Sequence, residues 1–295
     1  MEKSLVLEGG GTRGIYTAGV LDYLFEKEFR FDSYYGTSMG ACSIANYLSE
    51  QPERNSQIIY DYINDKRYFN VLNFFKKDKE VMGMDFLFDT VPNKLNFFDY
   101  KTFFENDKNF IAVATDLDTG KAVYLKKKNA ETKKDVMKML RASSSLPGLA
   151  NEVYYKDKRL LDGGISDSIP IKYCLKDGND KALVVLTRDK TYRKSPLKGK
   201  IFYKRRFKEY PEFFNSLINR YRRYNEKLDF IKELEKNKDI FVIRPSKPIN
   251  ISRFERDVDV FKDLYNLGRK DAKRKFKDLK DYLNEDIVTE KEVIN

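Results

Sequence analysis

The chain has 295 residues and a formal net charge of +11, and 41% of its residues are hydrophobic, so it can bury a sizeable core and favours anionic partners. It contains no histidine and two cysteines, Cys42 and Cys174, which argues against a disulfide framework and against the common kinds of zinc site. We therefore expect no metal, no cofactor, and two reduced cysteines packed in the core.

The apolar run before the first glycines, 4–8, is too short for the core of a signal peptide. No run of about 18 apolar residues suggests a membrane-spanning helix. We expect a cytoplasmic protein that is either soluble or attached peripherally at the inner membrane surface, where its positive charge would favour anionic lipid.

Apolar periodicity predicts strands that alternate with helices over the first two-thirds of the chain. In order, the expected elements are a strand at 4–8, a helix at 13–28, a strand at 31–36, a helix at 39–50, a mostly helical stretch at 51–107, a hairpin at 109–117 and 121–127, a helix at 132–145, a strand-turn-strand unit at 151–164 and a strand at 181–187. They are followed by a basic, mainly helical stretch at 198–239, a strand at 239–246 and a long helix at about 255–284. This alternation predicts an α/β fold with a mainly parallel, helix-flanked sheet.

The glycine-rich segment 9–14, GGGTRG, matches Gly-x-Gly-x-x-Gly between a predicted strand and a predicted helix. Such a loop serves a dinucleotide pyrophosphate or an oxyanion hole, because both need close approach to backbone amides; a tight turn without a ligand is a third interpretation. Dinucleotide binding requires an acidic residue about 20 positions later, at the end of the second strand. Asp32 has that distance but stands at the start of the strand, so the loop alone leaves the alternatives open.

A serine lies between two glycines in the segment Gly36-Thr37-Ser38-Met39-Gly40, directly after a predicted strand. This pattern is typical of the sharp turn that exposes a nucleophilic hydroxyl in many hydrolases. Ser38 also opens a predicted helix, whose dipole favours negative charge at that point. We expect Ser38 to be a nucleophile.

The two glycine motifs are expected to meet in space. If strands 4–8 and 31–36 are parallel neighbours, both following loops lie at the same edge of the sheet, with the strands about 4.8 Å apart. The amides of Gly10 and Gly11 then face the serine turn, and the amide of Met39 is a further donor. Together these amides predict an oxyanion hole.

The base that takes the serine proton cannot be histidine, since the chain has none. Asp162 follows an apolar strand and precedes Gly163-Gly164, although Asp-Gly-Gly is also ordinary turn chemistry. A carboxylate, with a reference pKa of about 3.9, is a weak base, so it needs a dry site in which burial raises its pKa and an oxyanion hole stabilises the developing charge. A Ser-x-x-Lys pair is excluded because position 41 is Ala41.

Three motifs in this order, GGGTRG, GTSMG and DGG, resemble those of the patatin-like phospholipase family. The stretches ATDLDTG (114–120), RASSSLPGLA (141–150) and DSIPI (167–171) are similar too, and the resemblance covers about residues 4–190. It implies a three-layer α/β/α patatin-like fold with a mainly parallel central sheet. It also implies a calcium-independent lipid acyl hydrolase with a Ser-Asp dyad.

Carried onto this sequence, the resemblance makes Ser38 the nucleophile and Asp162 the base that also activates water. Gly10 and Gly11 lie in the matching oxyanion loop. The glycines of the three motifs are Gly9, Gly14, Gly36, Gly40, Gly163 and Gly164.

Two further residues are candidates for substrate binding by the same resemblance. Arg13 stands where the family usually has a basic residue, with a role near a lipid phosphate or in a salt bridge that holds the loop. Pro147 lies in a segment that borders the site in relatives, or it simply stops a helix.

Ten basic and three acidic residues fall between 198 and 228, interleaved with aromatic residues. The segment predicts either an interfacial helix that attracts anionic lipid, or a solvated helix whose aromatic rings face the core. Nucleic acid is not expected, because no known module for reading it is present. We expect a patatin-like catalytic domain at 1–190 and a basic, mainly helical C-terminal extension at 191–295.

The sequence thus predicts a carboxylic ester hydrolase of the phospholipase A, lysophospholipase or esterase type, acting on a lipid or acyl ester through an acyl-Ser38 intermediate. The alternative is a non-catalytic module on the same fold that binds lipid or a membrane surface. A nucleotide-binding enzyme is a third interpretation, which depends on the glycine loop alone.

Overall fold

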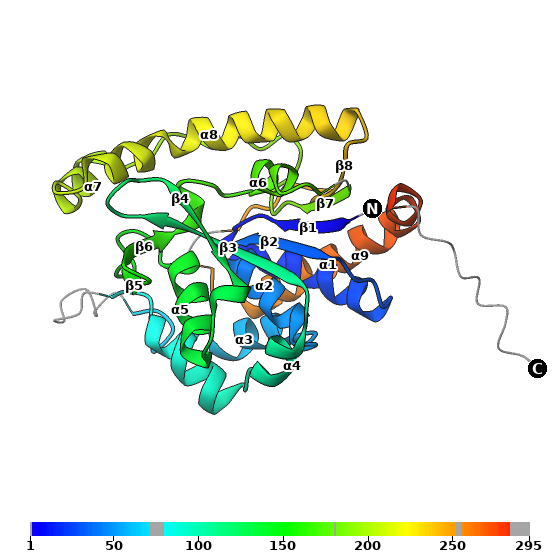
Figure 1. Ribbon diagram of the computed structural model, residues 1–295, viewed down its shortest axis with the longest axis horizontal. Coiled ribbons are helices and arrows are strands. Elements are labelled where there is room, and N and C mark those ends of the chain that lie inside the picture. The colour runs from blue at the N-terminus through cyan, green and yellow to red at the C-terminus, as the bar shows by residue number, and fades with distance from the viewer. Residues whose placement is uncertain (1, 71–79, 180, 252–254, 284–295) are drawn as a thin grey trace, which may run out of the picture.

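The computed structural model describes residues 2–70, 80–179, 181–251 and 255–283, and its centre is an eight-stranded mixed sheet (Figure 1). The strands lie in the order β5-β6-β3-β2-β1-β7-β8, and β4 pairs with β3 outside this order. They are β1 (Lys3–Leu7), β2 (Ser33–Thr37), β3 (Asn109–Asp116), β4 (Ala122–Lys126), β5 (Val153–Tyr155), β6 (Lys158–Asp162), β7 (Lys181–Val185) and β8 (Ile240–Ile243). The neighbouring strands β3-β2-β1-β7-β8 pair in parallel. The pairings of β4 with β3, β6 with β3 and β5 with β6 are antiparallel.

Helices cover both faces of this sheet. The described helices are α1 (Gly14–Glu26), α2 (Met39–Leu48), α3 (Arg54–Tyr62), α4 (Tyr100–Glu105), α5 (Lys133–Ser144), α6 (Ile171–Lys176), α7 (Lys200–Arg206), α8 (Pro211–Lys236) and α9 (Val258–Leu283), with short or irregular turns η1 (Gly11–Arg13), η3 (Phe86–Leu95), η4 (Lys127–Asn129) and η5 (Gly163–Ile165). In Figure 1, α6 and α8 lie over one face of the sheet, and α1, α2, α5 and α9 lie over the other.

Successive residues of the central strands face opposite layers, which produces two cores. Leu5 and Leu7 of β1 belong to the core beneath α1, α2, α5 and α9, whereas Val6 between them belongs to the core beneath α6 and α8. Tyr34 and Tyr35 of β2 divide in the same way. Because both faces are covered, these strands are buried at nearly every position. The predicted three-layer α/β/α fold with a mainly parallel sheet is confirmed.

The predicted elements occur close to their expected positions, and the hairpin of β3 and β4 is antiparallel as expected. The short helix α6 was not predicted, because six residues give too little periodicity to distinguish a helix. Of the stretch expected to be mostly helical, 71–79 lies outside the described residues.

The chain after residue 190 shares the sheet and core of the preceding part. β8 pairs with β7, and α9 packs across α1. The two helix backbones approach closely: a Cβ at Gly19 would lie 2.1 Å from the carbonyl oxygen of Tyr265, and one at Gly268 would lie 2.1 Å from that of Tyr16. The helical C-terminal region is confirmed, whereas its division from the rest at residue 190 stays a prediction.

The crossing of α1 and α9 predicts that Gly268→Ala destabilises the fold. The added methyl would meet the rigid backbone of α1, and such overpacking costs about 1–3 kcal/mol even though alanine is the better helix former. Urea unfolding followed by circular dichroism measures the change. The control is Asn266→Ala, at an exposed position of α9, which should leave the free energy of unfolding unchanged or slightly raised. Equal stability of Gly268→Ala and the wild type would contradict the close crossing.

Candidate active site

Ser38 occupies a strained turn between β2 and α2. Its backbone has φ 55° and ψ −126°, a conformation that costs a non-glycine residue about 1–3 kcal/mol. The Ser38 amide donates to Ser143 Oγ at 2.8 Å, and the Ser143 hydroxyl donates to the carbonyl of Val113 at 2.6 Å. The Thr37 hydroxyl donates to the carbonyl of Asp167 at 2.9 Å. These buried bonds hold the turn from both sides.

The glycines around the turn are required by close contacts. A Cβ at Gly36 would lie 2.8 Å from an amide nitrogen of α2, and one at Gly40 would lie 2.9 Å from the carbonyl oxygen of Glu8. A Cβ at Gly9 would lie 3.0 Å from the carbonyl oxygen of Thr37. Side chains at these positions would push α2 and the glycine loop away from the turn.

The glycine loop lies beside the serine turn because β1 and β2 are parallel neighbours, as the sequence predicts. The contact is tight, since a Cβ at Gly14 would lie 2.3 Å from Cγ of Met39. The amides of Gly10, Gly11 and Met39 donate to no acceptor in the described part of the chain. These three amides are therefore available to a ligand, and their role as an oxyanion hole stays a prediction.

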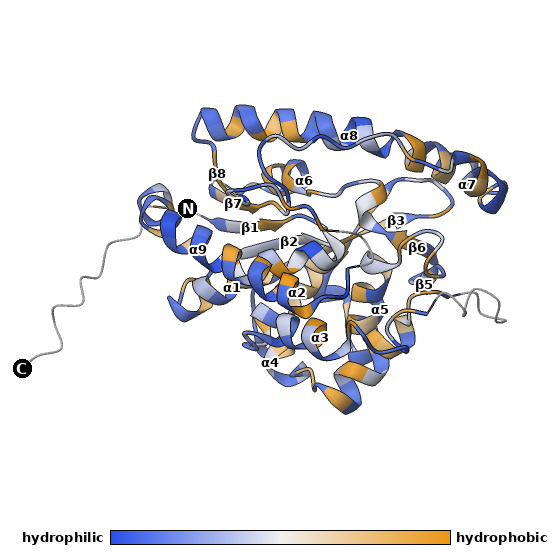
Figure 2. Cartoon of the chain, turned by 180° about the vertical axis from the view of Figure 1, so that it is seen from behind, coloured by the Kyte–Doolittle hydropathy of each residue, from blue (hydrophilic) through white to orange (hydrophobic). Residues whose placement is uncertain are grey.

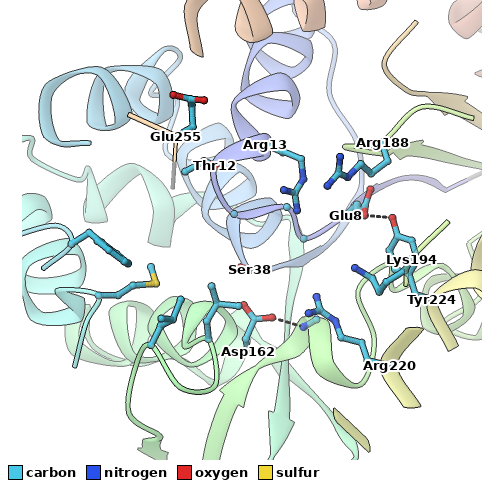
Figure 3. A pocket seen from close by; sticks show the side chains of 18 of the residues that line it. Glu8, Thr12, Arg13, Ser38, Asp162, Arg188, Lys194, Arg220, Tyr224 and Glu255 are labelled. Carbon is cyan, nitrogen blue, oxygen red and sulfur yellow. Dashed lines mark hydrogen bonds between the residues drawn. The ribbon is translucent and has the colours of Figure 1, made fainter. Parts of the chain in front are cut away.

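Asp162 ends β6 and is only 2% exposed. Its Oδ1 accepts a hydrogen bond from the Gly164 amide at 2.7 Å, while its buried Oδ2 has no hydrogen-bond partner among the residues that the structure describes. Burial raises the pKa of the Asp162 carboxyl, and the opposing influences are Arg220 and the Ser38 hydroxyl. Ser38 and Asp162 lie next to each other in Figure 3, close enough to interact but outside hydrogen-bond geometry.

The two glycines after Asp162 allow this approach. A Cβ at Gly163 would lie 2.1 Å from the carbonyl oxygen of Val113, the residue that pairs with Thr37 across the sheet. A Cβ at Gly164 would lie 2.7 Å from Asp162 Oδ1. Asp162 and the serine turn are thus positioned against the same short segment of β3.

Two cavities meet at Ser38. The charged cavity contains Ser38 and Asp162, and its charged lining residues are Glu8, Arg13, Arg188, Lys194, Arg220, Glu255 and Arg256. The apolar cavity also contains Ser38, and its apolar walls include Ile59, Leu87, Phe88, Phe98, Met137 and Leu140. A hydroxyl at the boundary of a charged and an apolar cavity can meet a molecule that has one polar and one apolar end.

Residues 5–175 match the family model of patatin-like phospholipases. The chain belongs to the patatin-like phospholipase family. Residues 210–284 match a second family model, described as a domain of unknown function, DUF6363.

This patatin-like protein has a relative with which it aligns over most of the length of both proteins. The chain is 29% identical over 275 residues to the uncharacterized protein YjjU of Escherichia coli K12, a match that spans 90% of this chain and 74% of that protein. It is 34% identical over 103 residues to triacylglycerol lipase 4 of Saccharomyces cerevisiae, which covers 35% of this chain and only 10% of the lipase. Among solved structures, VipD of Legionella pneumophila aligns with a TM-score of 0.45 and 14% identity, covering 94% of this chain and 67% of that one.

Three cations of the charged cavity, Arg188, Lys194 and Arg220, lie outside the matched patatin-like region, and the sequence did not single them out as site residues. A signal for Arg220 was present. It stands at helical spacing between Leu217 and Tyr224, which are both buried, so it falls on the inward face of α8. Arg188 and Lys194 lie in a loop without periodicity, where no comparable signal exists.

The other candidate residues have different surroundings. Arg13 lines the charged cavity without an ion pair to any described acidic side chain, so no salt bridge holds the loop there. Pro147 lies between Leu146 and Leu149, which line the charged cavity, and does not itself line it. Asp32 lies at the other end of β2 from the glycine loop, with its carboxylate 3.4 Å from the Lys108 ammonium, so it is not placed for a dinucleotide ribose.

The two cysteines are free. Cys174 is fully buried against the Ser4 hydroxyl, with Sγ and Oγ 3.1 Å apart, as expected for a core cysteine. Cys42 lines the apolar cavity, and burial raises the pKa of its thiol to about 11. The Cys42 side chain therefore stays neutral at pH 7 and contributes an apolar surface.

The basic segment 198–228 divides into two parts. On α8, aromatic residues such as Phe213 and Tyr224 are buried, as the core interpretation predicts, and Lys227 pairs with the Asp167 carboxylate at 2.9 Å. On α7, Ile201 is 85% exposed. Figure 2 shows both hydrophilic and hydrophobic residues along these helices. None of the helices within the described ranges is both long and apolar enough to span a bilayer.

The strained turn predicts that Ser38→Gly is more stable than Ser38→Ala. Both variants lose the hydroxyl, but only glycine adopts φ 55° without steric cost, which should favour it by about 1–2 kcal/mol despite its larger unfolded-state entropy. Thermal unfolding of the two variants measures the difference. If the alanine variant is as stable as the glycine variant, the turn is not strained.

Proposed function

We propose that this patatin-like protein is a lipid acyl hydrolase in which Ser38 is the nucleophile and Asp162 the base. The observation that carries the proposal is the position of Ser38 at the boundary of the two cavities, beside a buried carboxylate and three amides without acceptors. An acyl chain would occupy the apolar cavity, and the alcohol part of the ester would occupy the charged one. Membership of the patatin-like phospholipase family supports a lipid substrate.

In the first half of the proposed reaction, Ser38 Oγ attacks the ester carbonyl carbon while its proton passes to the free oxygen of Asp162. The tetrahedral oxyanion accepts hydrogen bonds from the amides of Gly10, Gly11 and Met39. Collapse of this intermediate breaks the bond to the alcohol oxygen, which takes the proton from Asp162 and leaves. The acyl group remains on Ser38 as an ester.

In the second half, a water molecule attacks the acyl-Ser38 carbonyl and gives its proton to Asp162. Collapse of the second tetrahedral intermediate expels Ser38 Oγ, which recovers the proton from Asp162, and the fatty acid is released. A carboxylate can serve as the base because burial raises its pKa. The proton transfers coincide with formation of an oxyanion that the free amides stabilise, so no isolated alkoxide is needed.

The dyad predicts that Ser38→Ala and Asp162→Asn each lower ester hydrolysis by at least about a thousandfold without unfolding the protein. Hydrolysis of p-nitrophenyl and phospholipid esters gives the rates. Labelling with a fluorophosphonate probe and mass spectrometry identify the nucleophile, which should be Ser38.

A matched control for this experiment is Ser49→Ala, a buried serine at the end of α2 whose hydroxyl bonds only local groups. That variant should keep both labelling and turnover. Wild-type protein that binds lipid vesicles but neither labels at Ser38 nor turns over any ester would instead support the non-catalytic lipid-binding alternative.

We further propose that α7 attaches the protein peripherally to an anionic lipid surface. Ile201 is 85% and Phe202 46% exposed, and the basic residues around them are Lys198, Lys200, Lys204, Arg205, Arg206 and Lys208. The Phe202 ring lies against Gly148, since a Cβ there would be 3.5 Å away, and the flanking Leu146 and Leu149 line the charged cavity. Apolar insertion near the cavity, supported by basic charge, would bring the site to its substrate.

This attachment predicts that the double variant Ile201→Ser/Phe202→Ser loses about tenfold in affinity for vesicles containing phosphatidylglycerol, because less apolar surface enters the lipid. Co-sedimentation measures binding. Phe97→Ser, at a 68% exposed aromatic residue before α4, is the control and should bind like the wild type. Two results would rule out α7 as an anchor for anionic lipid. One is equal vesicle binding by the double variant and Phe97→Ser, and the other is equal binding of the wild type to neutral and to anionic vesicles.

A further inference from the structure

Four basic side chains gather on one side of the charged cavity, near Glu8 and Tyr224 (Figure 3). They are Arg13, Arg188, Lys194 and Arg220. Both oxygens of the Glu8 carboxylate are already used: one accepts the Tyr224 hydroxyl at 2.5 Å and the other the Thr187 amide at 2.6 Å. We name the four basic residues the cation cluster.

The cation cluster lacks acidic partners. No ion pair joins any of its members to an acidic side chain within the described ranges. The Nε atoms of Arg13 and Arg220 are buried and have no hydrogen-bond partner there either. The Lys194 ammonium lies over the Tyr224 ring, 4.4 Å from its centroid. Glu8 and Asp162 are the carboxylates that act electrostatically on these four partly buried cations, so positive charge is in excess and the cluster is suited to an anion.

Electrostatic repulsion within the cluster also favours binding of an anion. Burial, together with the positive charges of Arg220, Arg13 and Arg188 and against the opposing charge of Glu8, lowers the pKa of Lys194 to about 7. Burial and Arg188 likewise lower the pKa of Arg13. An anion bound among these groups would relieve their mutual repulsion.

The cluster shares its cavity with Ser38 and Asp162, while the apolar cavity lies on the other side of Ser38. We propose that the cation cluster binds a phosphate ester anion in the alcohol part of the substrate, a proposal that rests on the hydrolase function proposed above. The preferred substrate is then an acyl ester of a phosphate-bearing alcohol without a compensating positive charge. A choline headgroup would add another cation to this site and is disfavoured.

Kinetics with three substrates of one acyl chain test this specificity: lysophosphatidic acid, lysophosphatidylcholine and monoacylglycerol in neutral detergent micelles. For the wild type, kcat/KM should be at least tenfold higher for lysophosphatidic acid than for the other two. Lys194→Gln should lower that ratio about tenfold, because one charge-assisted contact is lost, and Lys194→Arg should restore it. Lys194 suits the test because its backbone stays anchored to Asn225 by two hydrogen bonds.

The matched control is Arg222→Gln, which removes one positive charge from the exposed side of α8 and should leave the ratio unchanged. Equal rates for all three substrates in the wild type would overturn the proposal. So would an equal effect of Lys194→Gln and Arg222→Gln on the ratio.

Calorimetry on Ser38→Ala separates this proposal from the proposed function. Glycerol 3-phosphate should bind, and adding Lys194→Gln should weaken it about tenfold. Affinity should also fall as pH rises through about 7, where Lys194 loses its charge. The charged and titratable groups facing Lys194 are Arg13, Arg188, Arg220, Glu8, Asp162, Tyr192 and Tyr224.

Two combinations of the kinetic and calorimetric results are decisive. If no ester is hydrolysed but glycerol 3-phosphate binds in the manner described, the hydrolase function fails while the phosphate site stands. If inorganic phosphate binds as tightly as glycerol 3-phosphate and no anionic substrate is preferred, the cluster binds free phosphate and the headgroup proposal is overturned.

Discussion

Parallel pairing of β1 with β2 is the constraint on which the site depends. It brings the ends of two strands together, so the loop after β1 and the turn after β2 occupy the same edge of the sheet. The space between them leaves little room for a side chain at Gly9 and Gly14, because a Cβ at either would press on the serine turn or on Met39. The free amides and the strained Ser38 backbone are local consequences of this packing.

The Asp162 carboxylate is placed beside the serine turn by a second set of strand pairings. β3 pairs with β2 on one side and with β6 on the other, so Val113 stands between the serine turn and the chain after Asp162. Its carbonyl accepts the Ser143 hydroxyl that holds the Ser38 amide, and Gly163 packs directly against it. Burial raises the pKa of Asp162 while Arg220 opposes the rise, which is the electrostatic balance that its proposed role as a base requires.

The part of the chain beyond the patatin-like match is structurally continuous with the site. β8 extends the sheet, α9 crosses α1, and α8 crosses the other face. Through this arrangement Arg188, Lys194 and Arg220 become walls of the cavity that contains Ser38. The proposed substrate preference thus depends on segments outside the patatin-like match, and the second matched model, residues 210–284, includes one of these cations.

The order of strands and helices, the three motifs and the family are readable from the amino-acid sequence, because each depends on short-range spacing or on local steric needs. The glycine loop, the serine turn and Asp-Gly-Gly are visible in the chain since only glycine fits those backbones. Tertiary packing, in contrast, sets which side chains reach the cavity: Arg220 lines it while Ile201 stays exposed, and Arg188 and Lys194 join Arg13 there. Composition gives the number of charged side chains. Whether such a side chain points into the cavity depends on how α8 and the loop that contains Arg188 and Lys194 pack against the sheet. That is a long-range property, and no local pattern of residues encodes it.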